Sequence, residues 1–295
     1  MERNQHPYIR RLLRTPASTR HLARARAGVP LTFVAGEPGA GKSTLLARLA
    51  SLPQKRSIAV VSHDSDTSSR LTELGQTVDH VFLEVGSTSE LRRANGYAYL
   101  PGFRPCGLVI VLSAPSVLAM RPDTLPERIQ DASVVVINKA DLLSGFELQR
   151  ATGWLSRAIA PLPLVYSRNG DVAAQLFLGV DQSTSADEVP TVVAPWTHAF
   201  EVSATRGTRN VRALCAEKCR AWSLHANAPV DPIAFRSWVE RLPRTVIRGH
   251  GSVTFQMEPP IQYRFELFGA HWGLERHGQL DRTVTQSKVF LVGLA

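Results

Sequence analysis

The chain has 295 residues, of which 44 % are hydrophobic, and this composition excludes a disordered protein and permits one large domain or two smaller ones. No apolar run reaches the roughly 18 residues of a membrane span, no secretory signal is evident, and three cysteines do not make a disulfide framework, so a cytoplasmic protein without a membrane partner is expected. The net charge of +9 would suit a nucleic-acid binder, but seven arginines and one glutamate within residues 1–30 account for +6 of it.

These arginines predict a basic arm over residues 1–28. We favour a solvated, partly helical arm; contact with RNA or an acidic partner, and a mitochondrial transit peptide, are the alternatives. Because the charges of the remaining residues are nearly balanced, nucleic acid is not the expected partner. The arginines of the arm are Arg3, Arg10, Arg11, Arg14, Arg20, Arg24 and Arg26.

Six apolar runs follow the arm. They are continuous rather than alternating, and several are rich in valine and isoleucine, as is typical of strands buried on both faces of a parallel sheet. The segments between them, such as 42–51, 64–75 and 145–160, are long enough for crossover helices. The pattern predicts a doubly wound α/β domain over residues 29–185. The runs are LTFVAG (31–36), SIAVVSH (57–63), HVFLEV (80–85), LVIVLSA (108–114), SVVVINK (133–139) and LPLVYS (162–167).

The first run leads into GEPGAGKST, residues 36–44, which satisfies the pattern G-x-x-x-x-G-K-[ST]. Glycines let such a loop curl so that its backbone N–H groups point at phosphate oxygens, and the following helix directs its positive end there. Lys42 is expected to reach the β- and γ-phosphates and Ser43 to ligate Mg²⁺. A chance glycine-rich turn is the alternative, which the position between a strand and a helix disfavours. The expected nucleotide-binding residues of this loop are Gly36, Gly39, Ala40, Gly41, Lys42, Ser43 and Thr44.

Carboxylates follow the second and third runs, Asp64 and Asp66 in SHDSDTSS and Glu84 in FLEVGS. We expect them over the γ-phosphate, where a carboxylate can hold a Mg²⁺-bound water or orient the attacking water. Lys42, Asp64 and Glu84 are therefore predicted as catalytic residues, and Ser43, Asp64 and Glu84 as the magnesium site. For Asp66, a helix cap is an equally good interpretation.

The fifth run ends abruptly in Asn138-Lys139-Ala140-Asp141. Asp141 offers two acceptor oxygens, which match the N1–H and N2–H₂ donors of guanine, whereas adenine presents an acceptor at N1. Asn138 can hold the other edge of the base and tie its loop to the phosphate loop, and the stem of Lys139 can lie against the base. The alternative is a polar strand end at which Asp141 caps a helix. After a phosphate loop the guanine interpretation is favoured, so GTP is the expected ligand and an ATP-dependent small-molecule kinase is disfavoured.

The pattern changes at residues 181–197, whose Ser, Thr, Asp and Pro content predicts a linker. Beyond it we predict a smaller α+β domain over residues 196–295, with an antiparallel sheet and helices on one side. The expected elements are a strand at 198–204, helices at 210–222 and 231–242, and strands within 245–257, 261–274 and 288–294.

Two cysteines, Cys215 and Cys219, would share one face of the predicted helix 210–222. With His198 or His225 they could bind Zn²⁺ or Co²⁺, but we favour their being apolar fillers on a buried face. Cys106, next to a proline at the start of a strand, is also expected to serve packing. His63 either senses the state of the nucleotide or, as we favour, ends a strand.

Taken together, these motifs resemble those of the CobW-like metallochaperone GTPases, relatives of the GTPases that mature urease and hydrogenase. The resemblance covers nearly all of the chain apart from the arm, more loosely in the C-terminal part. It implies a GTPase that dimerises or acts through switch loops, with a small second domain that engages a client protein, and a transition metal whose release is coupled to GTP hydrolysis. The matching segments are GEPGAGKST (36–44), HDSDT (63–67), LEVGS (83–87), INKAD (137–141), APVDPIAFRSWVERLPRTVIRGHGSV (228–253) and SKVFLVGL (287–294).

The sequence departs from this family at its cysteine motif, C-x-C-C, which lies between the second-strand Asp and the third-strand Glu. None of the nineteen residues between Asp64 and Glu84 is a cysteine, and His250 stands where the family has a lysine. We therefore expect GTP and Mg²⁺ as cofactors and no tight transition-metal site in the GTPase domain. The predicted function is that of a GTP-hydrolysing maturation or metal-insertion factor for a client protein. The alternative is a GTP-regulated scaffold that binds its partner without handling metal.

Overall fold

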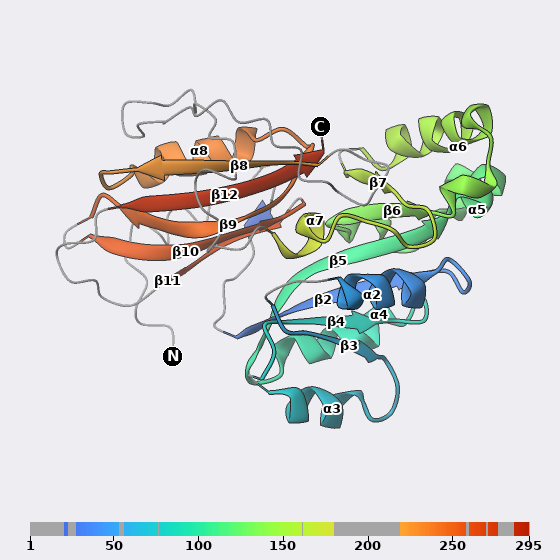
Figure 1. Ribbon diagram of the computed structural model, residues 1–295, viewed down its shortest axis with the longest axis horizontal. Coiled ribbons are helices and arrows are strands. Elements are labelled where there is room, and N and C mark those ends of the chain that lie inside the picture. The colour runs from blue at the N-terminus through green and yellow to red at the C-terminus, as the bar shows by residue number, and fades with distance from the viewer. Residues whose placement is uncertain are drawn as a thin grey trace. The chain divides into compact units, whose positions relative to one another are not determined.

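The computed structural model describes residues 21–22, 28–52, 56–75, 77–160, 162–179, 219–257, 260–269, 271–276 and 286–294. It divides into an N-terminal unit, which contains the described part of Arg26–Leu178, and a C-terminal unit, which contains the described part of Arg220–Gly293 (Figure 1). Within the described residues, no helix combines the length and the apolar character needed to cross a membrane.

The N-terminal unit is built on a parallel sheet of six strands in the order β3-β4-β2-β5-β6-β7. All six predicted apolar runs form these strands, so the expected doubly wound α/β fold is confirmed. Strands β2, β4 and β6 are buried along almost their whole length, which explains their continuous apolar sequence. The strands are β2 (Val29–Gly36), β3 (Ile58–Ser62), β4 (His80–Glu84), β5 (Phe103–Ser113), β6 (Val134–Asn138) and β7 (Leu164–Tyr166).

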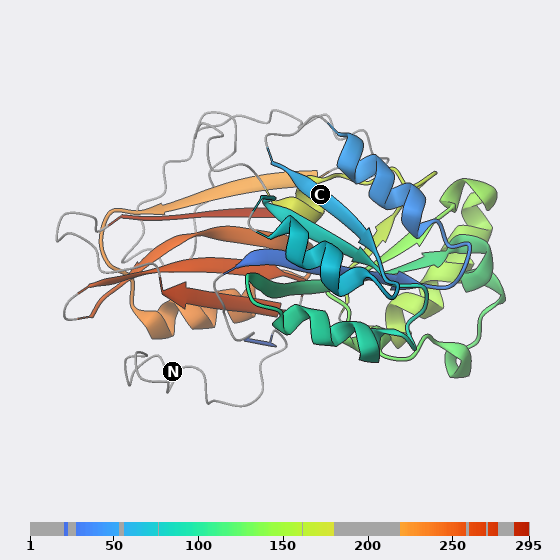
Figure 2. The same cartoon turned by 90° about the horizontal axis from the view of Figure 1, so that it is seen from below.

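Helices flank this sheet (Figure 2). Leu71 and Leu91 pack α3 and α4 against β2 and β4, and Val117 and Leu155 pack α5 and α6 against β5 and β6. On the other side, α2 contacts β2, β3 and β4. The helices are α2 (Lys42–Ser51), α3 (Thr67–Leu74), α4 (Leu91–Ala94), α5 (Ala114–Ala119), α6 (Gly145–Ala158) and α7 (Gln175–Leu178), with 3-10 turns η1 (Asn95–Tyr99), η2 (Pro122–Thr124), η3 (Ile129–Asp131) and η4 (Ala140–Leu142).

The C-terminal unit is a second sheet of six strands, in the order β1-β11-β10-β9-β12-β8. Neighbouring strands pair antiparallel along β11-β10-β9-β12, while β1 pairs parallel with β11. Phe235 of α8 packs edge-on against Phe255, Phe265 and Trp272 of the sheet. The elements are β1 (His21–Leu22), β8 (Cys219–Ala226), α8 (Pro232–Arg241), β9 (Val246–Phe255), β10 (Ile261–Phe268), β11 (His271–Arg276) and β12 (Ser287–Leu294).

The helix predicted over residues 210–222 is wrong at its C-terminal end, where Cys219–Ala226 form strand β8. Every second residue of this strand, Trp222, Leu224 and Ala226, packs into the core. This spacing of two is that of a strand, whereas the prediction extends the helical spacing of the preceding residues. The predicted run 261–274 also divides into two strands, because the chain turns at Gly269, whose φ is 56°. Several predicted features lie outside the described residues: the arginines of the arm, the linker 181–197, the strand 198–204, His198 and Cys215.

Candidate functional site

The phosphate loop follows β2 and passes close to β5 and to the end of β6. Two of its positions, Gly36 and Gly41, therefore have no room for a side chain. A Cβ atom at Gly36 would lie 2.0 Å from the carbonyl oxygen of Val111 on β5. At Gly41, which precedes α2 with a φ of 92°, a Cβ atom would lie 2.3 Å from Nδ2 of Asn138. Glycine at both positions therefore lets the loop pass close to β5 and to the end of β6.

Lys42 lies inside this loop with only 7 % of its surface exposed. Its Nζ donates to the carbonyl oxygens of Gly36 at 3.0 Å, Glu37 at 3.0 Å and Gly86 at 3.1 Å. Because an ammonium has three donors, these carbonyls match its hydrogen-bonding capacity. Burial lowers the pKa of Lys42 from its ordinary value, while nearby carboxylates, that of Glu84 first, oppose the shift. The ammonium therefore joins the phosphate loop to the segment after β4.

Ser43 and Glu84 meet at the same edge of the sheet. The hydroxyl of Ser43, in the first turn of α2, donates to Oε1 of Glu84, at the end of β4, over 2.7 Å. Hydroxyl and carboxylate oxygens are the kinds of ligand that Mg²⁺ prefers. The two side chains thus fit a magnesium ion, and the structure brings together two of the three residues that the sequence assigns to it.

The third residue, Asp64, is engaged elsewhere within the described residues. Its Oδ1 accepts the backbone N–H of Asp66 at 2.9 Å, and its Oδ2 lies 3.0 Å from the guanidinium of Arg70 on α3. Asp66 occupies the N-cap position of α3, but its side chain makes no capping hydrogen bond. It is therefore Asp64 that shapes the turn into α3, and its carboxylate would have to leave Arg70 to act on a nucleotide.

His63 lies beside the segment that follows β4. A ring nitrogen of His63 is 3.7 Å from the carboxylate of Glu90, and its ring packs edge-on against Tyr97. The carboxylate of Glu90 also lies close to Gly86: a Cβ atom added at Gly86 would be 2.9 Å from it. Because Gly86 accepts the hydrogen bond from Lys42, His63 and Glu90 border the phosphate loop.

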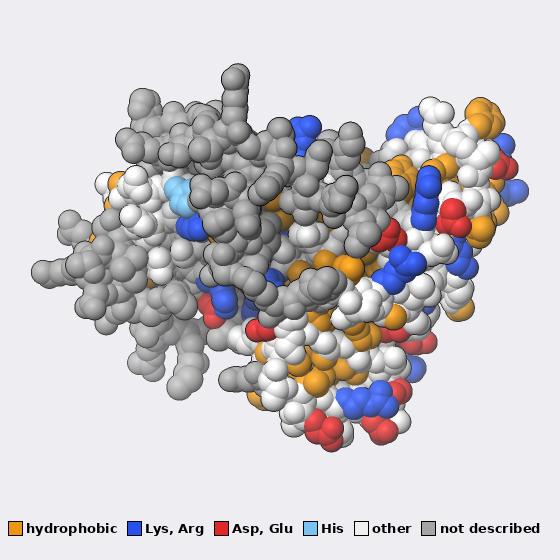
Figure 3. Space-filling model, in the orientation of Figure 1, with side chains coloured by type: hydrophobic (Ala, Val, Ile, Leu, Met, Phe, Trp, Pro, Cys, Tyr) orange, Lys and Arg blue, Asp and Glu red, His pale blue; other side chains and the backbone are white. Residues whose placement is uncertain are grey.

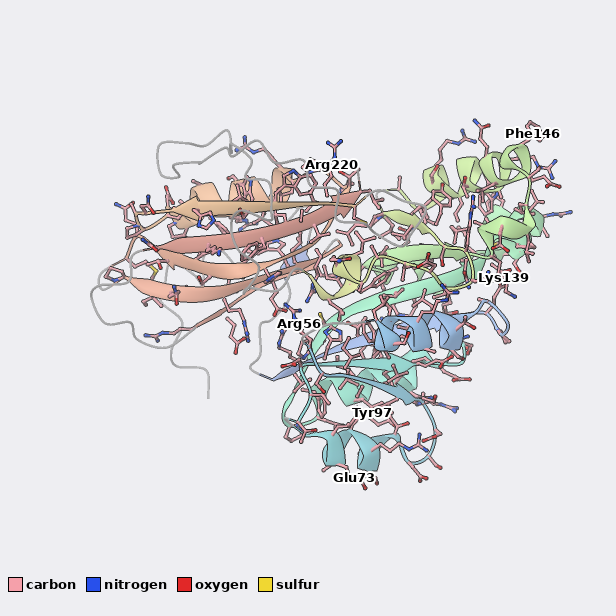
Figure 4. The ribbon with its side chains drawn as sticks, viewed as in Figure 1. Arg56, Glu73, Tyr97, Lys139, Phe146 and Arg220 are labelled. Atoms are coloured by element: carbon pink, nitrogen blue, oxygen red, sulfur yellow. The ribbon has the colours of Figure 1, made fainter. Side chains whose placement is uncertain are left out.

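The buried side chain of Asn138, 1 % exposed, connects three loops. Its Nδ2 donates to the carbonyl oxygen of Ala40 at 2.9 Å, and its Oδ1 accepts the backbone N–H of Gly170 at 3.0 Å. The bond to Ala40 is the predicted tie between this strand end and the phosphate loop. Next to it, Lys139 adopts a left-handed conformation with φ 58°, and Asp141 is exposed in η4. Figure 4 shows Lys139 at the edge of the sheet from which the phosphate loop emerges.

Sequence reasoning missed the loop Ser167–Gly170 after β7. Ser167 accepts the backbone N–H of Ala140 at 3.1 Å, so this loop supports the turn that carries Asp141. Gly170, with φ 73°, lies so close to α2 that a Cβ atom would be 2.8 Å from the backbone nitrogen of Leu45. The hydroxyl of Ser167 is buried with no hydrogen-bond partner in the described part of the chain. The Asn-Gly pair in the sequence SRNG marks a turn here, but it gives no sign of a site.

Of the residues considered for a transition metal, the structure describes Cys219 and His225, and it does not bring these two together. Cys219 and His225 lie near opposite ends of β8, on the order of 20 Å apart at 3.3 Å per residue. Burial, and to a lesser extent the charge of Lys288, lowers the pKa of His225. Cys106 lies within β5. In the described ranges, no three His, Cys, Asp or Glu side chains form a group suited to a metal ion.

Charged side chains of both signs are interspersed over the coloured part of the N-terminal unit in Figure 3. Acidic and basic residues also pair within this unit, as Arg128 does with Asp131 at 2.7 Å and Arg92 with Glu127 at 3.5 Å. The described surface seen in that view therefore offers no broad field of a single sign.

Comparisons with known proteins found one family that matches the C-terminal part of the chain and several solved structures with low similarity to it. Residues 219–294 match the family described as "Cobalamin synthesis protein cobW C-terminal domain", which supports the resemblance to CobW-like proteins. The Zn(II)-bound YjiA GTPase from E. coli is 12 % identical over 91 % of this chain and 95 % of its own, with a TM-score of 0.37. A Zn(II)-bound triple mutant of YjiA is 14 % identical over the same shares, with a TM-score of 0.39. HypB from Helicobacter pylori in complex with nickel is 16 % identical over 49 % of this chain and 80 % of its own, with a TM-score of 0.33. No curated protein matches the sequence.

The amide bridge of Asn138 generates a prediction about stability. Asn138→Asp keeps an acceptor for Gly170 but sets a carboxylate oxygen against the carbonyl oxygen of Ala40. We expect a loss of about 2–4 kcal/mol in the free energy of unfolding of the N-terminal unit, because a buried donor–acceptor pair becomes a repulsive one. The measurement is urea denaturation at pH 8 followed by far-ultraviolet circular dichroism.

The matched control is Asn169→Asp, since Asn169 is exposed and its φ of 53° is one that aspartate tolerates. It should change the free energy of unfolding by less than about 0.5 kcal/mol. Equal stability of the two variants would show that the amide of Asn138 does not hold these loops together.

Proposed function

We propose that this CobW-like chain binds GTP together with Mg²⁺, hydrolyses it, and serves as a maturation or metal-insertion factor for a client protein. The observation that carries the proposal is that the buried amide of Asn138 donates to the carbonyl of Ala40 and accepts the N–H of Gly170, because these two bonds hold the turn of Asp141 beside the phosphate loop. A nucleotide that lies across both would set its triphosphate at Lys42 and its base at Asp141.

The exposed carboxylate of Asp141 supports guanine as the base. It has no hydrogen bond or ion pair with another described side chain, so both of its oxygens are available to a ligand. Two acceptors side by side suit the N1–H and N2–H₂ donors of guanine and repel the N1 lone pair of adenine. The left-handed backbone of Lys139, one residue after the buried Asn138, turns the chain out of the sheet toward the solvent. The aliphatic stem of Lys139 is then free to cover one face of the base.

At the phosphate end, Lys42 would exchange its three carbonyl partners for phosphate oxygens, which relieves the cost of a buried ammonium among neutral groups. Ser43 and Glu84 would hold Mg²⁺, which when bound neutralises charge on the phosphate oxygens. Glu84 and, once it leaves Arg70, Asp64 would orient the attacking water through hydrogen bonds.

For the C-terminal unit we infer a role in engaging the client, on the basis of its match to the CobW C-terminal domain. The metal would be the cargo of this reaction. The scaffold function remains the second candidate, since no cysteine lies between Asp64 and Glu84 and the described ranges hold no three-residue metal site. Titration of the pure protein with Zn²⁺, Co²⁺ or Ni²⁺, with and without GTP, separates the two: metal affinity that depends on GTP favours insertion, and its absence favours the scaffold.

The guanine assignment predicts the effect of Asp141→Asn. The amide loses one charge-assisted acceptor and presents a donor to N2–H₂, so GTP affinity should fall by about 3 kcal/mol, roughly a hundredfold. Xanthosine triphosphate, which has a carbonyl at C2, should bind the variant better than the wild type. Asp123→Asn, an exposed change in η2, is the control and should leave both affinities unchanged. Wild-type protein that binds ATP as tightly as GTP would disprove the assignment.

The assignment of Ser43 and Glu84 predicts slower hydrolysis when either is removed. Ser43→Ala deletes a magnesium ligand, and Glu84→Ala deletes a carboxylate beside it. Each should lower kcat by about tenfold to a thousandfold, with an unchanged circular dichroism spectrum. Phosphate release at saturating GTP is the measurement, and Ser156→Ala on the exposed side of α6 is the matched control. If Glu84→Ala turns over GTP like the wild type, Glu84 has no part in the reaction.

A further inference from the structure

A carboxylate stands inside the phosphate loop at a position where the G-x-x-x-x-G-K-[ST] pattern allows any residue. Glu37 directly follows Gly36, and its Oε1 accepts the backbone N–H of Ser113 at 3.1 Å. Ser113 ends β5, the strand that pairs with β2 up to the partners Gly36 and Val111. The carboxylate is therefore tethered between the ends of two neighbouring strands rather than swinging freely in solvent.

The same residue is also close to the ammonium that would meet the phosphates. The carbonyl oxygen of Glu37 accepts a hydrogen bond from Nζ of Lys42 at 3.0 Å. Its carboxylate is one of three, with those of Glu84 and Glu90, whose charge acts on the pKa of Lys42 in opposition to burial. A fixed negative charge thus lies at the site where a triphosphate would bind.

Three carboxylates, those of Glu84, Glu37 and Glu90, thus act on the single ammonium of Lys42. The three carboxylates have different partners. That of Glu84 accepts a hydrogen bond from the hydroxyl of Ser43, and that of Glu90 lies 3.7 Å from a ring nitrogen of His63. That of Glu37 accepts a hydrogen bond from a backbone N–H. Glu84 is assigned to the magnesium ion itself. Glu37 is the one of the three that belongs to the phosphate loop.

We propose that Glu37 is a specificity-determining residue, which makes the site accept the magnesium complex of GTP and reject the metal-free nucleotide. The inference rests on the proposed function, because it assumes that GTP is the ligand. Metal-free GTP brings its full triphosphate charge against the carboxylate, whereas bound Mg²⁺ neutralises part of that charge. A fixed like charge discriminates against the wrong form of a ligand more than it strengthens binding of the right one.

The test is the binding of GTP in excess MgCl₂ and in excess EDTA, measured by isothermal titration calorimetry for the wild type and Glu37→Gln. Glutamine keeps an oxygen for the N–H of Ser113 and removes the charge. Affinity in EDTA should rise by about five- to twentyfold, since a like charge tethered in the phosphate loop is removed. Affinity in MgCl₂ should change by less than about twofold. Glu73→Gln removes an exposed carboxylate of α3, labelled in Figure 4, and should match the wild type in both solutions.

Two further variants separate charge from positioning. Glu37→Ala loses the tether to Ser113 as well as the charge, so it should gain affinity in EDTA but lose affinity in MgCl₂. Glu90→Gln removes a half-exposed charge that acts on the same ammonium, and it should raise affinity in EDTA by about two- to fivefold. Glu90→Gln also provides the same comparison should Glu37→Gln fail to give a native circular dichroism spectrum.

An unchanged ratio of the two affinities in Glu37→Gln, or wild-type protein that binds metal-free GTP as tightly as its magnesium complex, would overturn the inference and leave GTP binding intact. Absence of GTP binding in MgCl₂ by both the wild type and Glu73→Gln would instead reject the proposed function, and the inference with it.

Discussion

The arrangement of the site depends on one buried amide. Asn138 donates a hydrogen bond to Ala40 and accepts one from Gly170. Because the side chain is only 1 % exposed, loss of either bond would leave a buried polar atom unpaired, at a cost of about 1–3 kcal/mol. The bridge works only because both neighbouring chains approach very closely. Gly41 has no side chain to collide with the amide, and Gly170 has none to collide with Leu45 in α2. The hydrogen bonds of Asn138 therefore require glycine at both positions, because any side chain there would keep the chains apart.

Around this bridge, the side chains of the phosphate loop bind partners within the protein. Lys42 satisfies its donors with three backbone carbonyls, and Ser43 satisfies its hydroxyl with Glu84. A ligand must therefore compete with internal partners rather than fill an open cradle. One of those carbonyls belongs to Gly86, so this hydrogen bond connects Lys42 to the segment after β4. A ligand that drew Lys42 away from Gly86 would break this connection.

The sheet of the N-terminal unit could be predicted from the sequence because strands buried on both faces are continuously apolar, and the phosphate loop and Asn138 could be placed because their chemistry requires particular residues at fixed spacing. Features that lack such a sequence signature could not be predicted. Strand β8 begins in a segment whose apolar residues also fit a helix, and its alternation becomes clear only from Trp222 onward. The pairing of Asp64 with Arg70 depends on the exact course of a turn, and the loop at Ser167 acts through its backbone, which any sequence supplies. Backbone contacts and side-chain orientation in turns are therefore the parts that sequence reasoning leaves undetermined.

The bond between Asn138 and Ala40 joins residues 98 positions apart, and the second half of the bridge lies a further 32 positions along the chain. Contacts of such long sequence separation form late, since the chain must close large loops before they contribute to stability. During synthesis, the phosphate loop leaves the ribosome long before β6 and β7 are available to brace it. A nascent chain that ends before Gly170 therefore carries the complete phosphate-loop sequence and lacks the brace for it.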